Sequence, residues 1–108
     1  MADIELDGQS LTIEEAISVA NGKNTAVLAN SARSRMEESR AGVEQIIDSG
    51  QVVYGINTGF GAMSSVRIAG EDLEQLQANL IKSHACGVGD LMDPEHVLLM
   101  MIFRANSL

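Results

Sequence analysis

The 108-residue sequence has few of the residues that mark several classes of protein. Its single cysteine, Cys86, cannot form an internal disulfide, which indicates a reducing compartment and a cytoplasmic protein. Lys and Arg number 7 against 15 Asp and Glu, and the resulting net charge of −8 argues against binding to nucleic-acid phosphates. No apolar run is longer than seven residues, whereas a membrane-spanning helix needs about 20. A disulfide-stabilised secreted scaffold, a nucleic-acid-binding protein and a membrane protein are therefore all disfavoured.

With no tryptophan, one tyrosine and two phenylalanines, the core must be built from aliphatic residues, methionine and alanine. Hydrophobic residues make up 45% of the chain, which is typical of a folded domain. Ile4 and Leu6 alternate with acidic residues, which predicts a short N-terminal strand or hairpin. Thr12 and Glu15 then have the spacing of a capping box at the start of a helix. Most other apolar residues recur at helical spacing, so we expect a mainly α fold with about four helices and a glycine-rich loop.

The elements are expected in a definite order along the chain. We predict a strand and a short helix over residues 1–29, a long helix over 30–50, a Tyr- and Gly-rich active-site loop over 51–70, and two helices over 71–108. Within the first range, residues 22–29 are expected to be a connection. Residues 51–54, Gln-Val-Val-Tyr, are rich in β-branched side chains and are expected to be β-prone.

The last predicted helix is apolar on every side. Asp93 followed by Pro94 is a typical helix start, with the carboxylate as the cap. Residues 97–103 are all apolar, and seven consecutive residues cover every face of a helix. We therefore expect this helix to be buried all round, either within a larger protein or in a homo-oligomer.

A glycine-rich stretch over residues 55–70 interrupts the helical pattern, and loops of this length are usually functional or disordered. It is not a phosphate-binding loop, because it lacks the Gly-Lys-Ser/Thr ending. The two histidines lie twelve positions apart and no Cys-x-x-Cys occurs, so no local metal site is predicted. The only tyrosine, Tyr54, precedes this loop, and His84 lies on the apolar stripe of the helix that follows it.

Residue type alone leaves two interpretations open for Tyr54 and for His84. A phenol has an ordinary pKa of about 10, so Tyr54 is either a proton acceptor with special neighbours or a half-buried aromatic anchor. His84 is either a core histidine with a satisfied hydrogen bond or a side chain that binds a ligand. Cys86 does not pair with His84 as a nucleophile, because residues two apart on a helix point in different directions.

Three blocks of sequence favour the functional interpretations. Residues 53–61, Val-Tyr-Gly-Ile-Asn-Thr-Gly-Phe-Gly, resemble the signature segment of the aromatic amino-acid ammonia-lyases. Residues 76–89, which include Ser-His-Ala-Cys-Gly-Val-Gly, and residues 104–108, Arg-Ala-Asn-Ser-Leu, resemble later segments of that family in the same order. The Ser-His-Ala-x-Gly-Val-Gly form is similar to histidine ammonia-lyases. Tyrosine lyases are the nearest alternative, since they share a histidine at the position of His84.

The resemblance implies a chemistry, a site and an assembly. Enzymes of this family eliminate ammonia from an L-amino acid without pyridoxal phosphate or a metal, using a methylidene-imidazolone electrophile made from an internal Ala-Ser-Gly. The resemblance implies that Tyr54 is the catalytic base that removes a β-proton. It implies that His84 and Gly61 bind the substrate, which in a histidine lyase is L-histidine and yields trans-urocanate. It also implies a largely helical homotetramer with active sites shared between chains.

The sequence departs from the family in one respect, because it contains no Ala-Ser-Gly. The partial match Asp48-Ser49-Gly50 precedes Tyr54, whereas the triplet of the family follows all three blocks. Since family members are several-fold longer, the resemblance implies an N-terminal, incomplete part of a larger helical-bundle lyase fold that is inactive alone. A fragment of a tyrosine ammonia-lyase or aminomutase and a non-catalytic helical assembly module are the alternatives.

Overall fold

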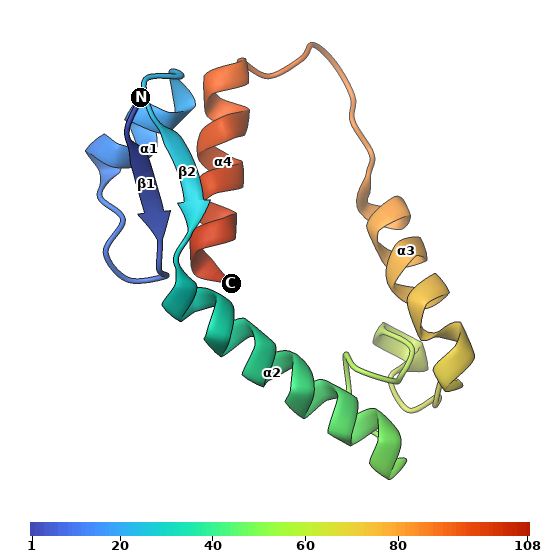
Figure 1. Ribbon diagram of the computed structural model, residues 1–108. Coiled ribbons are helices and arrows are strands. Elements are labelled where there is room, and N and C mark those ends of the chain that lie inside the picture. The colour runs from blue at the N-terminus through green and yellow to red at the C-terminus, as the bar shows by residue number, and fades with distance from the viewer. The chain divides into compact units, whose positions relative to one another are not determined.

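The computed structural model describes all 108 residues, which form two compact units. Unit 1 contains Met1–Glu37 and Asp90–Leu108, and unit 2 contains Glu38–Gly89. The strands are β1 (Asp3–Leu6) and β2 (Thr25–Leu28), and the helices are α1 (Ile13–Ala20), α2 (Asn30–Ser49), α3 (Leu73–His84) and α4 (Pro94–Ser107) (Figure 1). Two short 3₁₀ helices, η1 (Gly61–Met63) and η2 (Gly70–Asp72), precede α3. The prediction of a mainly helical fold with four helices is confirmed.

The two strands of unit 1 form a parallel sheet, in which Asp3 pairs with Thr25 and Leu6 with Leu28. The helix α1 connects them, so the alternative of an N-terminal hairpin is wrong, since hairpin strands are antiparallel. The interpretation of residues 22–29 as a plain connection is also wrong, because Thr25–Leu28 is β2. A four-residue strand carries little periodicity, and its pairing with β1 depends on residues more than twenty positions away.

The helix α1 begins where the sequence predicts it. The backbone N–H of Glu15 donates to Thr12 Oγ1 over 3.2 Å, and the N–H of Thr12 donates to Glu15 Oε2 over 2.9 Å. The capping box therefore provides acceptors for two N–H groups at the helix start. On the inner face of α1, Ala16 and Ala20 are buried, and their small size allows neighbouring elements to approach closely.

The core of unit 1 is a cluster of Leu6 from β1, Ala16 from α1 and Ile102 from α4. Four partly buried side chains pack against it: Leu11, Val19, Ala26 and Leu99. The start of α4 is as predicted, since the N–H of Glu95 donates to Asp93 Oδ1 over 2.8 Å. The helix therefore joins α1 and the sheet through a single face.

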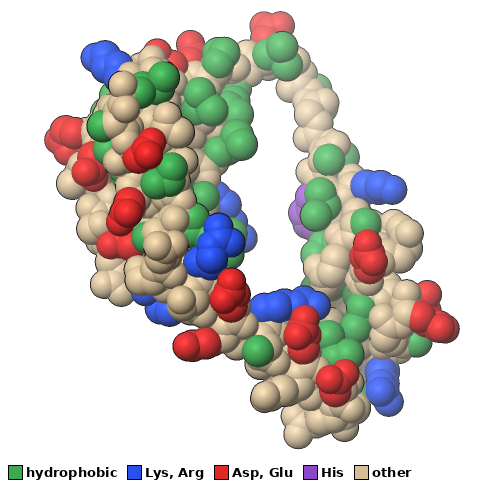
Figure 2. Space-filling model, in the orientation of Figure 1, with side chains coloured by type: hydrophobic (Ala, Val, Ile, Leu, Met, Phe, Trp, Pro, Cys, Tyr) green, Lys and Arg blue, Asp and Glu red, His purple; other side chains and the backbone are tan.

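Within this chain α4 is covered on one side only, and its burial in a larger protein or in a homo-oligomer stays a prediction. Only Ile102 of the apolar run is buried, whereas Met100 and Met101 are 61% and 62% exposed. Figure 2 shows hydrophobic side chains gathered at the surface over α4, at its place in Figure 1. No helix of the chain combines the length and the apolar character needed to span a membrane.

The turn after β1 is fixed by the Asp7 carboxylate. It accepts hydrogen bonds from the N–H of Ser10 over 2.7 Å, from the N–H of Gln9 over 2.8 Å and from the Ser10 hydroxyl over 2.7 Å. These donors lower the pKa of Asp7 from 3.8 to about 2. The N–H of Gly8, which directly follows Asp7, donates to Asn106 Oδ1 over 3.0 Å. This bond connects the turn to the end of α4.

Unit 2 begins within α2, which contributes residues 30–37 to unit 1 and residues 38–49 to unit 2. The helix ends at Ser49, and Gly50 follows with a φ of +72°, a conformation that favours glycine at a helix C-terminus. The apolar stripes of α2 and α3 are half-buried in this unit, as expected from their spacing: Val43, Ile46, Ile47, Leu73, Leu76 and Leu80.

Candidate functional site

Tyr54 lies in a tight turn just after α2 rather than in a strand. The N–H groups of Ile56 and Asn57 both donate to the Val53 carbonyl, over 3.1 and 3.3 Å. The Asn57 side chain then accepts from the N–H of Val53 over 2.8 Å and donates to the Gln51 carbonyl over 2.6 Å. The expectation of a β-prone segment over 51–54 is therefore wrong, because Asn57 takes up backbone groups that a strand would have paired.

The rest of the glycine-rich loop is ordered by backbone hydrogen bonds of its own. Thr58 and Arg67 form an isolated antiparallel bridge, and the N–H of Gly59 donates to the Val66 carbonyl over 3.0 Å. The N–H of Ile68 donates to the Asn57 carbonyl over 2.8 Å. The loop thus folds back on the turn that carries Tyr54, and Thr58 at its centre is fully buried.

The Tyr54 side chain is 63% exposed, so it is not a half-buried anchor within this chain. Its ring meets the ring of Phe60 edge to face, with centroids 6.0 Å apart and planes at 75°. Such a pair stabilises one ring orientation by about 0.5–1.5 kcal/mol beyond the area that it buries. The phenol is therefore oriented by a neighbour from its own loop and still open to a reactant.

His84 is the last residue of α3 and is exposed, so it is not a core histidine of this chain. Its Nδ1 lies 2.8 Å from the Leu80 carbonyl oxygen and 3.1 Å from Ser83 Oγ. A carbonyl oxygen only accepts, so Nδ1 carries the proton in the neutral ring. The bond to the backbone therefore fixes the tautomer, and it leaves Nε2 as a hydrogen-bond acceptor without a partner in this chain.

Gly61 opens η1 with a φ of +56°, a conformation that side chains other than glycine rarely adopt. A Cβ at this position would meet no atom within 4 Å, so the space beside Gly61 is open. Tyr54 and Gly61 lie on one loop, close to Phe60 in sequence, whereas His84 lies at the end of α3. No hydrogen bond joins His84 to the loop residues.

The sequence analysis did not identify two structurally important residues of this loop, and only one of them has a sequence pattern that indicates its role. Asn57 is 2% exposed and its side chain holds the Tyr54 turn. Asparagine next to glycines is a frequent turn former, which is the signal that could have found it. Gly59 is buried against Met63, and no local pattern announces that contact.

The residues present do not fit the methylidene-imidazolone precursor that the sequence resemblance implies. In the partial match, Ser49 Oγ donates to the Ile46 carbonyl over 2.9 Å, as a side chain at a helix end does. Gly50 is the glycine that ends α2. This triplet is thus a helix terminus, and no step of the chemistry can be assigned to it. No cluster of three His, Cys, Asp or Glu side chains is placed to hold a metal ion.

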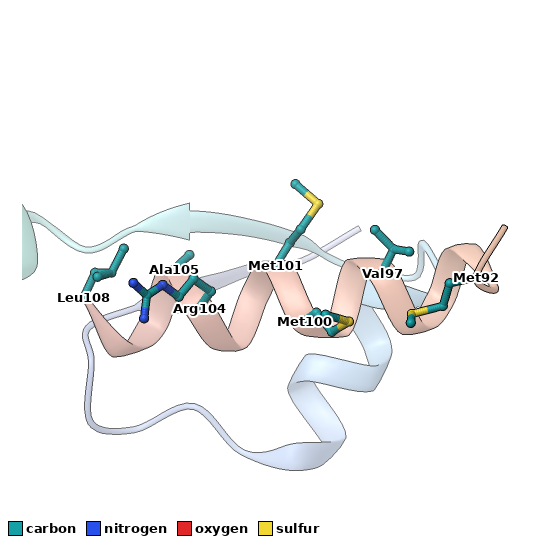
Figure 3. A pocket seen from close by; sticks show the side chains of 7 residues that line it. All are labelled: Met92, Val97, Met100, Met101, Arg104, Ala105 and Leu108. Carbon is teal, nitrogen blue, oxygen red and sulfur yellow. The ribbon is translucent and has the colours of Figure 1, made fainter. Parts of the chain in front are cut away.

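A second surface feature lies in unit 1, along α4. An open apolar groove of about 610 Å³ is lined by residues of this helix and its two flanks: Met92, Val97, Met100, Met101, Arg104, Ala105 and Leu108 (Figure 3). Arg104 is its only charged residue. The groove carries no acid, base or nucleophile, so it is suited to apolar contact rather than to chemistry.

The chain is similar to known proteins over almost its whole length. Residues 11–108 match the aromatic amino acid lyase family. The chain is 50% identical over 105 residues to the histidine ammonia-lyase of Geobacillus thermodenitrificans, an alignment that covers 97% of this chain and 21% of that protein. It therefore spans about a fifth of the length of the curated relatives it matches.

Two solved structures show the same arrangement of elements. Histidine ammonia-lyase from Trypanosoma cruzi is 37% identical with a TM-score of 0.85, covering 98% of this chain and 20% of that one. Tyrosine aminomutase from Streptomyces globisporus is 29% identical with a TM-score of 0.87, covering 96% of this chain and 20% of that one. On the family match and these similarities, the chain belongs to the aromatic amino acid lyase family.

Proposed function

We propose that this chain is the N-terminal part of a histidine ammonia-lyase, which eliminates ammonia from L-histidine to give trans-urocanate. The observation that carries the proposal is an exposed phenol at Tyr54 together with an exposed His84 whose Nε2 is an acceptor. Both residues lie in sequence blocks that resemble the family, in a chain 50% identical to a histidine ammonia-lyase. Residues 51–70 then form an active-site loop, and the remaining elements support it.

Tyr54 is assigned as the base. In its phenolate form, the oxygen takes the β-proton of the substrate, and the electron pair of that C–H bond forms the double bond as the C–N bond breaks. The products are urocanate and ammonium, so the reaction has no net redox change. The β-proton is only weakly acidic, so its removal is slow unless the base is held in place beside it.

His84 is assigned to substrate recognition. Its Nδ1–H is already bonded to the Leu80 carbonyl, so the free Nε2 accepts a hydrogen bond from a donor on the substrate ring. A neutral imidazole has one N–H to donate, whereas the ring of L-phenylalanine has none. The site is therefore expected to prefer histidine to phenylalanine. Gly61 binds substrate by leaving space, since no atom lies within 4 Å of where its Cβ would be.

The remaining parts of the proposal concern the whole polypeptide. A methylidene-imidazolone group would make the amino group a better leaving group, and no Ala-Ser-Gly in these 108 residues could supply it. We further propose a cytoplasmic homotetramer with shared active sites, which acts on a small amino acid. On this account, the 108-residue chain alone forms no urocanate even at high concentration.

Tyrosine lyase or aminomutase activity is the alternative enzyme function. It is supported by the TM-score of 0.87 with the tyrosine aminomutase from Streptomyces globisporus. The hydroxyl of tyrosine is also a donor, so Nε2 of His84 would accept from it equally well. The geometry of His84 therefore favours both histidine and tyrosine over phenylalanine. A direct assay is needed to decide between histidine and tyrosine.

Substrate turnover by the full-length polypeptide tests the proposal. Purified enzyme is incubated in parallel with L-histidine, L-tyrosine and L-phenylalanine, and the conjugated acid products are measured by ultraviolet absorbance. We expect kcat/KM to be highest for L-histidine. In the His84→Phe variant it should fall for histidine by at least about 10-fold while phenylalanine is used as well or better. Turnover of L-tyrosine alone would establish the alternative, and no turnover of any of the three would overturn the proposal.

A further inference from the structure

The turn that carries Tyr54 depends on one buried side chain that follows it in the sequence. Asn57 is 2% exposed, and both polar ends of its amide are used: Oδ1 accepts from the N–H of Val53, and Nδ2 donates to the Gln51 carbonyl. Val53 directly precedes Tyr54. The amide therefore ties down the backbone on the N-terminal side of the phenol.

The backbone of Asn57 is tied as well. Its N–H donates to the Val53 carbonyl over 3.3 Å, and its carbonyl accepts from the N–H of Ile68 over 2.8 Å. The first bond closes the turn around Tyr54, and the second fastens that turn to the far end of the glycine-rich loop. Asn57 is thus the residue at which the Tyr54 turn and the returning segment of the loop are joined.

Tyr54 itself has few contacts that could replace this support. Its side chain is 63% exposed and its one aromatic neighbour, Phe60, belongs to the same loop. Gly55, with a φ of +81°, adds no side chain to hold the turn. The position of the phenol is therefore set mainly by the backbone that Asn57 holds.

We propose that Asn57 is a positioning residue that sets the location of the Tyr54 phenol through the Val53 and Gln51 backbone. The inference rests on the proposed function, in which Tyr54 is the base. Asn57 does not touch the substrate in this account, and it acts only through Tyr54. A base displaced by about 1 Å loses up to about 100-fold in rate, whereas substrate binding by other groups is retained.

A double-mutant cycle in the full-length enzyme tests the inference. Tyr54→Phe, Asn57→Ala and the double variant are compared with wild type for kcat and KM on L-histidine, and melting temperatures are recorded. We expect Asn57→Ala to lower kcat by about 10- to 100-fold with little change in KM. In the Tyr54→Phe background the same substitution should have almost no further effect, because the phenol oxygen that it displaces is absent.

Two further variants distinguish a positioning role of Asn57 from a general loss of stability. Asn24 in unit 1 also uses both ends of its amide, since Oδ1 accepts from the N–H of Ala2 and Nδ2 donates to Ser18 Oγ. Asn24→Ala should lower the melting temperature without lowering kcat. If Asn57→Ala does not fold, Asn57→Asp takes its place, because it keeps the side-chain size and the acceptor for Val53 while it replaces the donor to Gln51 with a carboxylate oxygen.

The outcomes separate this inference from the function on which it rests. If Tyr54→Phe lowers kcat and Asn57→Ala does not, the function stands and the inference fails. If Asn57→Ala lowers kcat equally in both backgrounds, Asn57 does not act through Tyr54 and the inference also fails. If Tyr54→Phe leaves kcat unchanged, the assignment of the base is wrong, and the positioning role is overturned with it.

Discussion

Replacing Gly59 with alanine is expected to disrupt the glycine-rich loop through one steric contact. A Cβ at Gly59 would lie 2.6 Å from Met63 Cβ and 2.7 Å from the Met63 carbonyl oxygen. Non-bonded carbon atoms rest about 3.5–4.0 Å apart, so the overlap is about 1 Å. Rotation of the Met63 side chain cannot relieve it, because both atoms are fixed by the backbone.

The cost follows from what must move. The helix η1 has to shift away from Gly59, although the N–H of Met63 donates to the Phe60 carbonyl and the N–H of Val66 donates to the Met63 carbonyl, each over 3.0 Å. Overpacking costs about 1–3 kcal/mol, and the loss of one of these hydrogen bonds adds about 0.5–1.5 kcal/mol. We therefore expect Gly59→Ala to lower the free energy of unfolding of unit 2 by about 2–4 kcal/mol.

Urea unfolding followed by tyrosine fluorescence measures this change. Tyr54 is the only tyrosine and no tryptophan is present, so the signal reports the loop itself. Gly42→Ala is the matched control: Gly42 lies in α2 and no atom lies within 4 Å of where its Cβ would be, so alanine should stabilise the helix by about 1 kcal/mol. Equal unfolding midpoints for Gly59→Ala and wild type would refute the steric argument.

The other structural features make three further predictions. The pKa of Asp7 is lowered from 3.8 to about 2, so its contribution to stability is complete above about pH 4 and is lost as the pH falls towards 2. Over that pH range, urea titrations should show a smaller loss of stability for Asp7→Asn than for wild type. Equal losses for the two proteins would contradict this prediction. The apolar face of α4 should cause self-association. Met101 is 62% exposed on this helix, so Met101→Asp should reduce light scattering in a dilution series. Unchanged scattering would contradict self-association through this face. Gly61→Ala should lower the free energy of unfolding by about 1–2 kcal/mol, because Gly61 has a φ of +56°. A melting temperature equal to that of wild type would show that this position does not require glycine.

Features encoded by neighbouring residues could be predicted from the sequence. The capping box of Thr12 and Glu15 and the Asp93 cap depend on side chains within three positions of each other, so the sequence predicts the starts of α1 and α4 correctly. The end of α2 at Gly50 likewise follows from one residue with a positive φ. The three sequence blocks led to the family resemblance, and the match to the aromatic amino acid lyase family confirms that resemblance.

Two kinds of feature could not be predicted from the sequence: those that depend on residues far apart in the chain, and those that depend on which backbone groups a single side chain binds. The strand β2 exists because it pairs with β1 across α1. Residues 51–54 are β-prone by composition, but they do not form a strand, because the Asn57 amide bonds to the Val53 N–H and the Gln51 carbonyl. The approach of Gly59 to Met63 has no sequence pattern at all. The roles of Tyr54, Gly61 and His84 in the reaction stay predictions.

The kcat of the Tyr54→Phe variant of the full-length polypeptide, measured with L-histidine beside its melting temperature, tests the central claim most directly. The substitution removes one hydroxyl and retains the ring that packs on Phe60. If Tyr54 is the base, kcat should fall by about 10²–10⁴-fold while KM and the melting temperature change little. Turnover of L-histidine near the wild-type rate by a well-folded Tyr54→Phe enzyme would contradict the account.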